Sequence, residues 1–241
     1  LHGLANAARE QGDYAAARAA LRESLALARE VGDMAQVGSA LNYLGLIAIE
    51  EGDVAQARTI LTENLRILRE LDHQFLMFLA ITRLGHVAHA EGQLDEARRL
   101  YGESLAYQRM LGDQRGIANV LSNIGLTATD QGDPAAARAA LHESLSLVRP
   151  IDDRVALARV LSGFAGLAAL LGLPLRALRL GSAAAKLRAT TGLSHPRTLR
   201  DWQQRWVDVA RSTVDPEAAA AAWAEGQAMT LEQAIAEALD G

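Results

Sequence analysis

The feature that most constrains this chain is a turn signal that returns every 40 residues. A first series pairs a glycine with a following residue that is most often aspartate: Gly12-Asp13, Gly52-Asp53, Gly92-Gln93, Gly132-Asp133 and Gly172-Leu173. A second series with the same spacing lies about midway between these signals: Gly32-Asp33, Asp72-His73, Gly112-Asp113 and Asp152-Asp153. A strict period of this length is typical of stacked structural repeats, and two turns in each period predict two segments per repeat.

Each Gly-Asp pair predicts the end of one helix and the start of the next. The glycine can adopt the left-handed conformation that ends a helix, and the aspartate can accept hydrogen bonds from the free N–H groups of the following helix. The signal is most complete at Gly132-Asp133-Pro134, because proline is tolerated in the first turn of a helix. The turns leave helices of about 17 residues, two for each repeat.

Small and bulky residues recur at fixed places within the repeats. Gly45, Gly85 and Gly125 each follow a large apolar residue in the first helix, and the second helix carries a bulky residue at the same spacing. The bulky positions are Leu21, Leu61, Tyr101 and Leu141. We expect the glycine to let the two helices of a repeat approach closely, with the bulky side chain filling the space beside it.

The composition agrees with a helical protein and excludes several classes of function. Alanine and leucine dominate, 50% of the residues are hydrophobic and only 4% are aromatic. The absence of cysteine excludes a disulfide framework and a thiolate zinc site, so we expect a cytoplasmic protein. Basic and acidic residues are interspersed with a net charge of -5, which argues against direct nucleic-acid contact. The longest apolar stretch, Gly163 to Leu175, falls short of the roughly 20 residues of a membrane helix.

This pattern resembles the tetratricopeptide repeat family. The resemblance covers Leu1 to about Lys186 and is carried in one repeat by Leu41, Leu44-Gly45, Ala48, Ala57, Leu61 and Asn64. The 40-residue form is similar to the long-helix variant of kinesin light chains and many bacterial regulators, although leucine and alanine replace most of the usual aromatic residues. The resemblance implies an all-α, right-handed α-α superhelix over residues 1–190, with about five helix-turn-helix repeats near 1–31, 32–71, 72–111, 112–151 and 152–190.

Residues 191–241 are predicted to be a helical cap that belongs to the same domain. After a loop over 191–196, a helix over 197–212 carries Trp202 and Trp206 on one face, and we expect these tryptophans to cover the open end of the solenoid. Asp215-Pro216-Glu217 predicts the start of a second helix, and Thr230 with Gln233 predicts a capping box that opens a last helix.

The end of the chain carries a second resemblance. The stretch from Ala222 to Ala234 resembles the tail of the tetratricopeptide region in LuxR-type transcriptional regulators, signal-transduction ATPases and some nucleotide cyclases. Together with a truncated first repeat that begins at Leu1, this favours the sensing or regulatory C-terminal part of a multidomain bacterial protein. Two alternatives stay open: Trp223 and Met229 simply close the last repeat, and the chain is a free-standing adaptor.

No motif in the sequence indicates catalysis. There is no phosphate-binding Gly-x-x-x-x-Gly-Lys-Ser/Thr loop and no Gly-x-Ser-x-Gly elbow, so we expect neither an enzyme nor a bound cofactor. The acidic pair Glu50-Glu51 lies beside a turn, where a solvated helix end explains it. His86 and His89 are spaced to share a helix face, but a zinc site needs further ligands that no spacing supplies, so no metal site is predicted.

The family resemblance places the first helix of each repeat on the concave face, which implies a binding groove there. The chaperone-type carboxylate clamp is not reproduced, because Asn42, Thr82 and Ser122 replace its basic residues. We expect the groove to bind a polar or mildly acidic protein or peptide segment, or a small ligand, unless Arg83 pairs with an acid on an adjacent helix. The candidate groove residues are Asn42, Leu46, Ile49, Thr82, Arg83, His86, His89, Asn119, Ser122 and Arg159.

Deleting residues 215–241 should lower the melting temperature or cause aggregation, because a solenoid that loses its capping element exposes apolar surface. Thermal unfolding and light scattering of the truncated chain test this expectation. Unchanged melting and solubility would refute the capping role.

Overall fold

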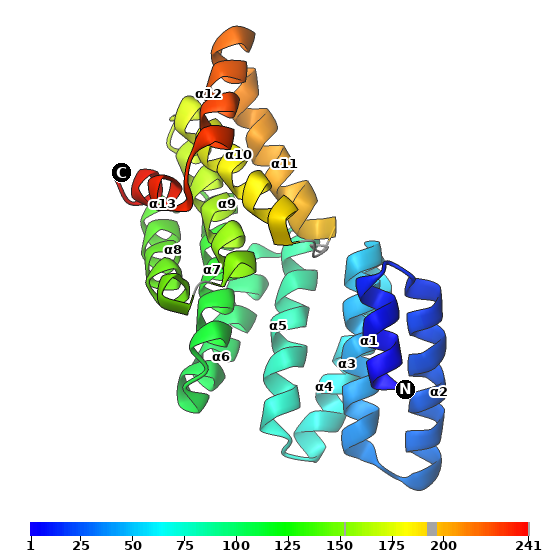
Figure 1. Cartoon of the computed structure of the whole chain (residues 1–241). Helices are drawn as coiled ribbons and strands as arrows, with labels where there is room; N and C mark the ends of the chain where they lie inside the picture. The colour runs from blue at the N-terminus through cyan, green and yellow to red at the C-terminus, as the bar shows by residue number, and fades with distance from the viewer. Residues whose placement is uncertain (152, 192–196, 241) are drawn as a thin grey trace. The chain divides into compact units, whose positions relative to one another are not determined.

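Pairs of antiparallel helices account for the 40-residue period (Figure 1). The computed structural model describes residues 1–151, 153–191 and 197–240, and within these ranges it contains α-helices and one short 3-10 turn but no strand. The five pairs are α1 (His2–Glu10) with α2 (Tyr14–Val31), α3 (Met34–Glu51) with α4 (Val54–Glu70), α5 (Gln74–Ala90) with α6 (Leu94–Leu111), α7 (Gln114–Asp130) with α8 (Pro134–Val148), and α9 (Arg154–Leu170) with α10 (Pro174–Thr191). The predicted all-α repeat fold is confirmed.

The turn chemistry follows the sequence closely. The seven turn glycines have backbone φ angles from 68° to 83°, in the left-handed region that glycine adopts at little cost. Asp72 takes the same region, with φ 49°, where the second series lacks a glycine. The aspartates that follow the glycines accept a hydrogen bond from the backbone N–H three residues later, as Asp13 does from Ala16 at 3.0 Å. At His73 the ring Nδ1 replaces the carboxylate, at a longer 3.4 Å from the Leu76 nitrogen.

Three further helices follow the repeats, at the places that the sequence predicted. They are α11 (Arg197–Ser212), α12 (Pro216–Ala228) and α13 (Leu231–Leu239). Asp215 caps α12, with Pro216 in its first turn, and Thr230 and Gln233 form the complete capping box of α13. Of the predicted loop over 191–196, Thr191 is the last residue of α10 and the remaining residues lie outside the described ranges.

The chain divides into two compact units, which we describe separately. The first unit comprises residues 1–110 with the start of α11, and the second comprises residues 111–193 and 199–241. In the first unit, Leu21, Leu41 and Ile47 are core residues contributed by α2 and α3. In the second, Leu141, Leu161 and Leu180 pack with Ile235 of α13. No helix in the described part of the chain has the length and apolarity needed to cross a membrane.

Glycine and a bulky residue meet inside each pair of helices. A Cβ atom added at Gly45 would lie 2.5 Å from Leu61, one at Gly85 would lie 2.5 Å from Tyr101, and one at Gly125 would lie 2.7 Å from Leu141. These distances leave no room for any other residue type unless the neighbour moves. The close approach expected from the sequence is therefore present in the second, third and fourth repeats.

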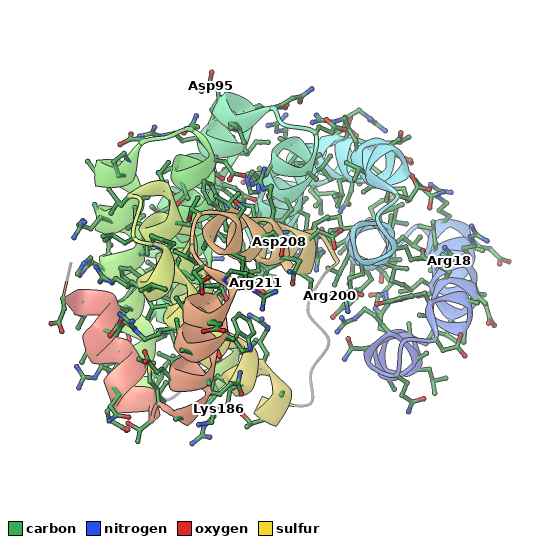
Figure 2. All side chains as sticks on the ribbon, turned by 90° about the horizontal axis from the view of Figure 1, so that it is seen from above. Arg18, Asp95, Lys186, Arg200, Asp208 and Arg211 are labelled. Carbon is green, nitrogen blue, oxygen red and sulfur yellow. The ribbon has the colours of Figure 1, made fainter. Side chains whose placement is uncertain are left out.

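Ion pairs connect the second helices α2 and α4 to the repeat that follows each of them, and a pair from the first helix α7 joins two repeats of the second unit. In the first unit Arg58 of α4 bonds Glu91 at 2.6 Å and Glu96 at 3.3 Å, and Arg18 of α2, labelled in Figure 2, pairs with Glu51 in the same register. The second unit has a comparable link between Arg115 and Asp153 at 2.8 Å. Because these side chains are partly exposed, each pair contributes only about 0–1 kcal/mol to stability.

Replacing Gly85 with alanine should lower the free energy of unfolding by about 1–3 kcal/mol, because the new methyl group overlaps the Tyr101 ring. Gly102 of α6 is the matched control: it is helical and has no atom within 4 Å of an added Cβ, so Gly102→Ala should stabilise the protein by roughly 0.5–1 kcal/mol. Urea denaturation of both variants measures the two effects. Equal shifts of the same sign would show that helix propensity, not close packing, decides the glycine positions.

Candidate partner-binding surface

The structure divides the predicted groove residues into half-buried and fully buried ones. On α3 and α5 of the first unit, Leu46, Thr82, Arg83, His86 and His89 are half-buried. On α7 and α9 of the second unit, Asn119 and Arg159 are half-buried as well. Asn42, Ile49 and Ser122 are 1–2% exposed, so a partner cannot reach their side chains.

The buried polar members join helices to one another. The Asn42 amide donates to the Leu76 carbonyl oxygen at 3.2 Å, which ties α3 to the start of α5. The Ser122 hydroxyl lies 2.9 Å from that of Ser144, and Thr82 lies 2.6 Å from Ser104, so each hydroxyl pair links the two helices of one repeat. These residues hold the scaffold, and the surface that a partner could contact narrows to Leu46, Arg83, His86 and His89, which we call the α3–α5 face.

A buried ion pair lies next to this face. Arg9 of α1 donates to Glu50 of α3 at 2.7 Å and to Asn6 at 3.0 Å. The Glu50 side chain is only 8% exposed, and its Oε2 atom has no hydrogen-bond partner. Burial therefore raises the pKa of Glu50, while the charges of Arg9 and Arg83 partly offset that rise.

Arg83 has a different environment, because no carboxylate of the described part of the chain bonds it. Its Nη1 donates to the Asn42 carbonyl oxygen at 2.9 Å, and its guanidinium lies 5.9 Å from the ring centre of Tyr43. Burial lowers the pKa of Arg83 to about 10, and nearby Tyr43 and Glu50 only partly counter this effect. The expected alternative, that Arg83 pairs with an acid on an adjacent helix, is not realised within the described residues.

The two histidines lie one turn further along α5. The His86 ring is 5.7 Å from the ring of Tyr101, and His89 lies in the last turn of the helix, where exposed carbonyl groups favour a positive charge. Within the described ranges, no group of three or more histidine, aspartate or glutamate side chains is arranged to hold a metal ion. Arg83 and the two histidines thus give the α3–α5 face a basic character.

The tryptophans of α11 do not cover the end of the repeats as the sequence analysis expected. Trp202 and Trp206 instead donate their indole N–H groups to Asp130, the last residue of α7, at 3.0 and 3.1 Å. Arg205 bonds the same carboxylate at 2.6 Å. The tryptophans turn this way because Gly166 of α9 leaves space for the Trp202 ring, whereas Val207 and Ala210 pack at the end of the repeats with Leu178 of α10.

Gly166 occupies the same repeat position as Leu46 and His86, so α11 covers a position whose residues are half-buried in the first unit.

The sequence did not predict the roles of Asp130 and Arg205. Two signals were available: an acid at the C-terminal end of a helix, where the helix dipole disfavours it, and glycines at 166 and 181 that interrupt the repeat pattern. Neither signal predicts which helix packs against these positions.

Comparisons with known proteins agree with the repeat architecture. A family model described as tetratricopeptide repeat matches residues 1–70 and 76–149. The crystal structure of BtubC (BKLC) from P. vanneervenii is similar with a TM-score of 0.61 and 19% sequence identity, over 91% of this chain and 89% of that chain. At that identity the similarity concerns the fold alone. A search of the curated proteins finds no match.

Replacing Arg83 with methionine should leave the free energy of unfolding unchanged or raise it by about 1 kcal/mol, because a buried charge without a carboxylate partner is removed while the apolar stem remains. The folded-state pKa lies below the unfolded one, so the cost of the charge is complete at every pH below about 10, and the effect should be the same at pH 6 and pH 8. Arg58→Met is the control and should destabilise the protein by about 0.5–1 kcal/mol, since it breaks an ion-pair network. Chemical denaturation at both pH values distinguishes the two, and a clear loss of stability in Arg83→Met would make Arg83 a structural residue.

Proposed function

Since this chain belongs to the tetratricopeptide repeat family, whose repeats are protein-interaction modules, we propose that it binds a protein or peptide segment through the α3–α5 face. The single observation that supports this site is Arg83, a half-buried residue whose guanidinium bonds one backbone carbonyl and lies near one aromatic ring, while no carboxylate among the described residues bonds it. An incoming carboxylate would supply the missing partner, and because the guanidinium has already lost water in the folded chain, only the carboxylate would still have to be desolvated. His86 and His89 extend the basic surface along the same helix, and Leu46 adds an apolar contact.

The partner segment that fits this face is polar to mildly acidic. Charge-assisted hydrogen bonds from a guanidinium to a carboxylate are stronger than neutral ones, and they fix the orientation of the bound segment. A small carboxylate-bearing ligand would satisfy the same donors. Asn119 and Arg159 are the corresponding candidates on the first helices of the second unit.

The wider role we propose is that of a non-catalytic sensing module in a cytoplasmic, multidomain bacterial regulator, either a LuxR-type transcription factor or a signalling ATPase. The resemblance of residues 222–234 to the tail of such proteins supports this context, and the acidic net charge disfavours direct nucleic-acid contact by these residues. The bare repeats fit a free-standing adaptor equally well. The full-length reading frame decides between them, because an adjoining ATPase or DNA-binding domain is expected only for the regulator.

A peptide array tests the binding site with defined probes. Immobilised 12-residue peptides of graded acidity are incubated with the wild-type chain and with the triple variant Arg83→Met, His86→Ala, His89→Ala. We expect acidic peptides to bind the wild type, and the triple variant to lose at least tenfold in affinity, which corresponds to about 1.4 kcal/mol.

Arg66→Met serves as the matched control, because Arg66 is exposed on α4 and, among the described residues, pairs only with Glu70 of its own helix. It removes the same charge from a different surface and should leave binding unchanged. Peptides that bind the triple variant as well as the wild type, but lose affinity for Arg66→Met, would place the site on the second helices instead.

A further inference from the structure

The negative charge of Asp130 lies at an electrostatically unfavourable position in its own helix. Asp130 is the last residue of α7, where the exposed backbone carbonyl groups repel a negative charge. Its side chain is only 9% exposed, so water screens the carboxylate poorly. A carboxylate at such a place needs donors from another element to offset its burial.

Helix α11 supplies three such donors from one of its faces. Residues three and four apart share a helix face, so Trp202, Arg205 and Trp206 all point toward the same carboxylate. Two indole N–H groups and one guanidinium bond the two oxygens of Asp130 at 2.6 to 3.1 Å. The combination is a specific chemical signature: a helix that presents Trp-x-x-Arg-Trp to an acid.

The surface beneath α11 departs from the repeat pattern at the two places where α11 rests. Gly166 stands where the earlier repeats have asparagine, leucine or histidine, and a Cβ added there would lie 2.5 Å from the Trp202 ring. Gly181 stands where the earlier repeats have leucine or tyrosine, and a Cβ added there would lie 3.1 Å from Val207. A notch for an indole and a notch for a branched side chain therefore flank Asp130.

The attachment of α11 is narrow compared with that of the repeat helices. Among the side chains of α11 that the structure describes, those of Trp202, Gln203, Val207 and Ala210 are buried, and the Gln203 amide nitrogen has no hydrogen-bond partner within the described ranges. The opposite side carries exposed charge such as that of Asp208, labelled in Figure 2, while the Arg211 guanidinium lies 4.7 Å from the ring centre of Trp223 in α12. Val207 and Ala210 join a small apolar cluster with residues of α9, α10 and α12. Few buried apolar groups and one unsatisfied polar group are features that favour local opening of a helix.

We propose that the surface around Asp130, Gly166 and Gly181 is a receptor site for an amphipathic helix of the Trp-x-x-Arg-Trp type, and that α11 is its built-in occupant, which a partner helix of the same chemistry displaces. This site lies in the second unit and does not depend on the function proposed for the α3–α5 face. The acid recognises paired indole and guanidinium donors, and the two glycine notches set the spacing of the side chains between them.

Hydrogen exchange on the full-length chain tests whether α11 can leave the site. We expect its amides to exchange through a local opening that is at least tenfold more frequent than the opening of α7 and α9. Exchange of α11 only together with those helices would make it an integral core helix and would overturn the proposal.

A labelled peptide of residues 197–212 then tests the receptor site directly. The Arg205→Glu chain sets a like charge against Asp130 and loosens its own α11, so it should bind the peptide at least tenfold more tightly than the wild type does. Arg200→Glu is the matched control, with the same charge change at an exposed position of α11, and should behave as the wild type. Adding Asp130→Asn to Arg205→Glu should abolish peptide binding.

Three results would contradict the proposal. They are equal peptide affinity of the wild-type and Arg205→Glu chains, binding that survives Asp130→Asn, and no binding to any variant. If Arg205→Glu does not fold, as judged by circular dichroism, Arg205→Ala replaces it with the same expected direction. A wild-type dimer that the peptide converts to monomer would instead assign the occupant to α11 of a second copy.

Discussion

The contact on which the rest of the structure depends is the close approach of the two helices in a repeat, where a glycine of the first helix faces a bulky residue of the second. Leu61, Tyr101 and Leu141 each occupy the space that a Cβ atom would need on the opposing helix. This contact fixes the depth to which the helices interlock, and therefore the register at which side chains such as Thr82 and Ser104 meet. The same contact between helices determines where outward-facing residues such as Arg83 lie.

Much of the fold could be predicted because its signals are local. A capping side chain acts within one turn, so the starts of α12 and α13 were predictable from Asp215 and Thr230. The repeat then carries each local signal to equivalent positions, and even the His73 cap keeps its place with a weaker acceptor. Along most of the described chain, the local turn and capping signals agree with the helices that the structure contains.

The candidate site was less predictable, because it depends on which side chains meet across helices. Repeat register identified the residues of the first helices but did not separate Asn42 and Ser122, which bond neighbouring helices, from Arg83 and His86, which stay accessible. The contact between Asp130 and α11 joins residues more than 70 positions apart, and no period in the sequence relates them. This contact depends on the three-dimensional arrangement of the helices and not on any local pattern.

The ion pairs between successive repeats make a small part of each inter-repeat contact depend on the surrounding salt. Hydrogen bonds inside the helices and glycine contacts inside each pair resist stretching at any ionic strength, whereas Arg58 and Arg18 bridge one repeat to the next through partly exposed charges. At physiological salt such charges are screened over about 8 Å, and at lower salt they act over longer distances. Raising the ionic strength therefore weakens the ion-pair part of the contact between successive repeats of the first unit, while the apolar part, to which Leu21 and Leu41 belong, keeps its strength.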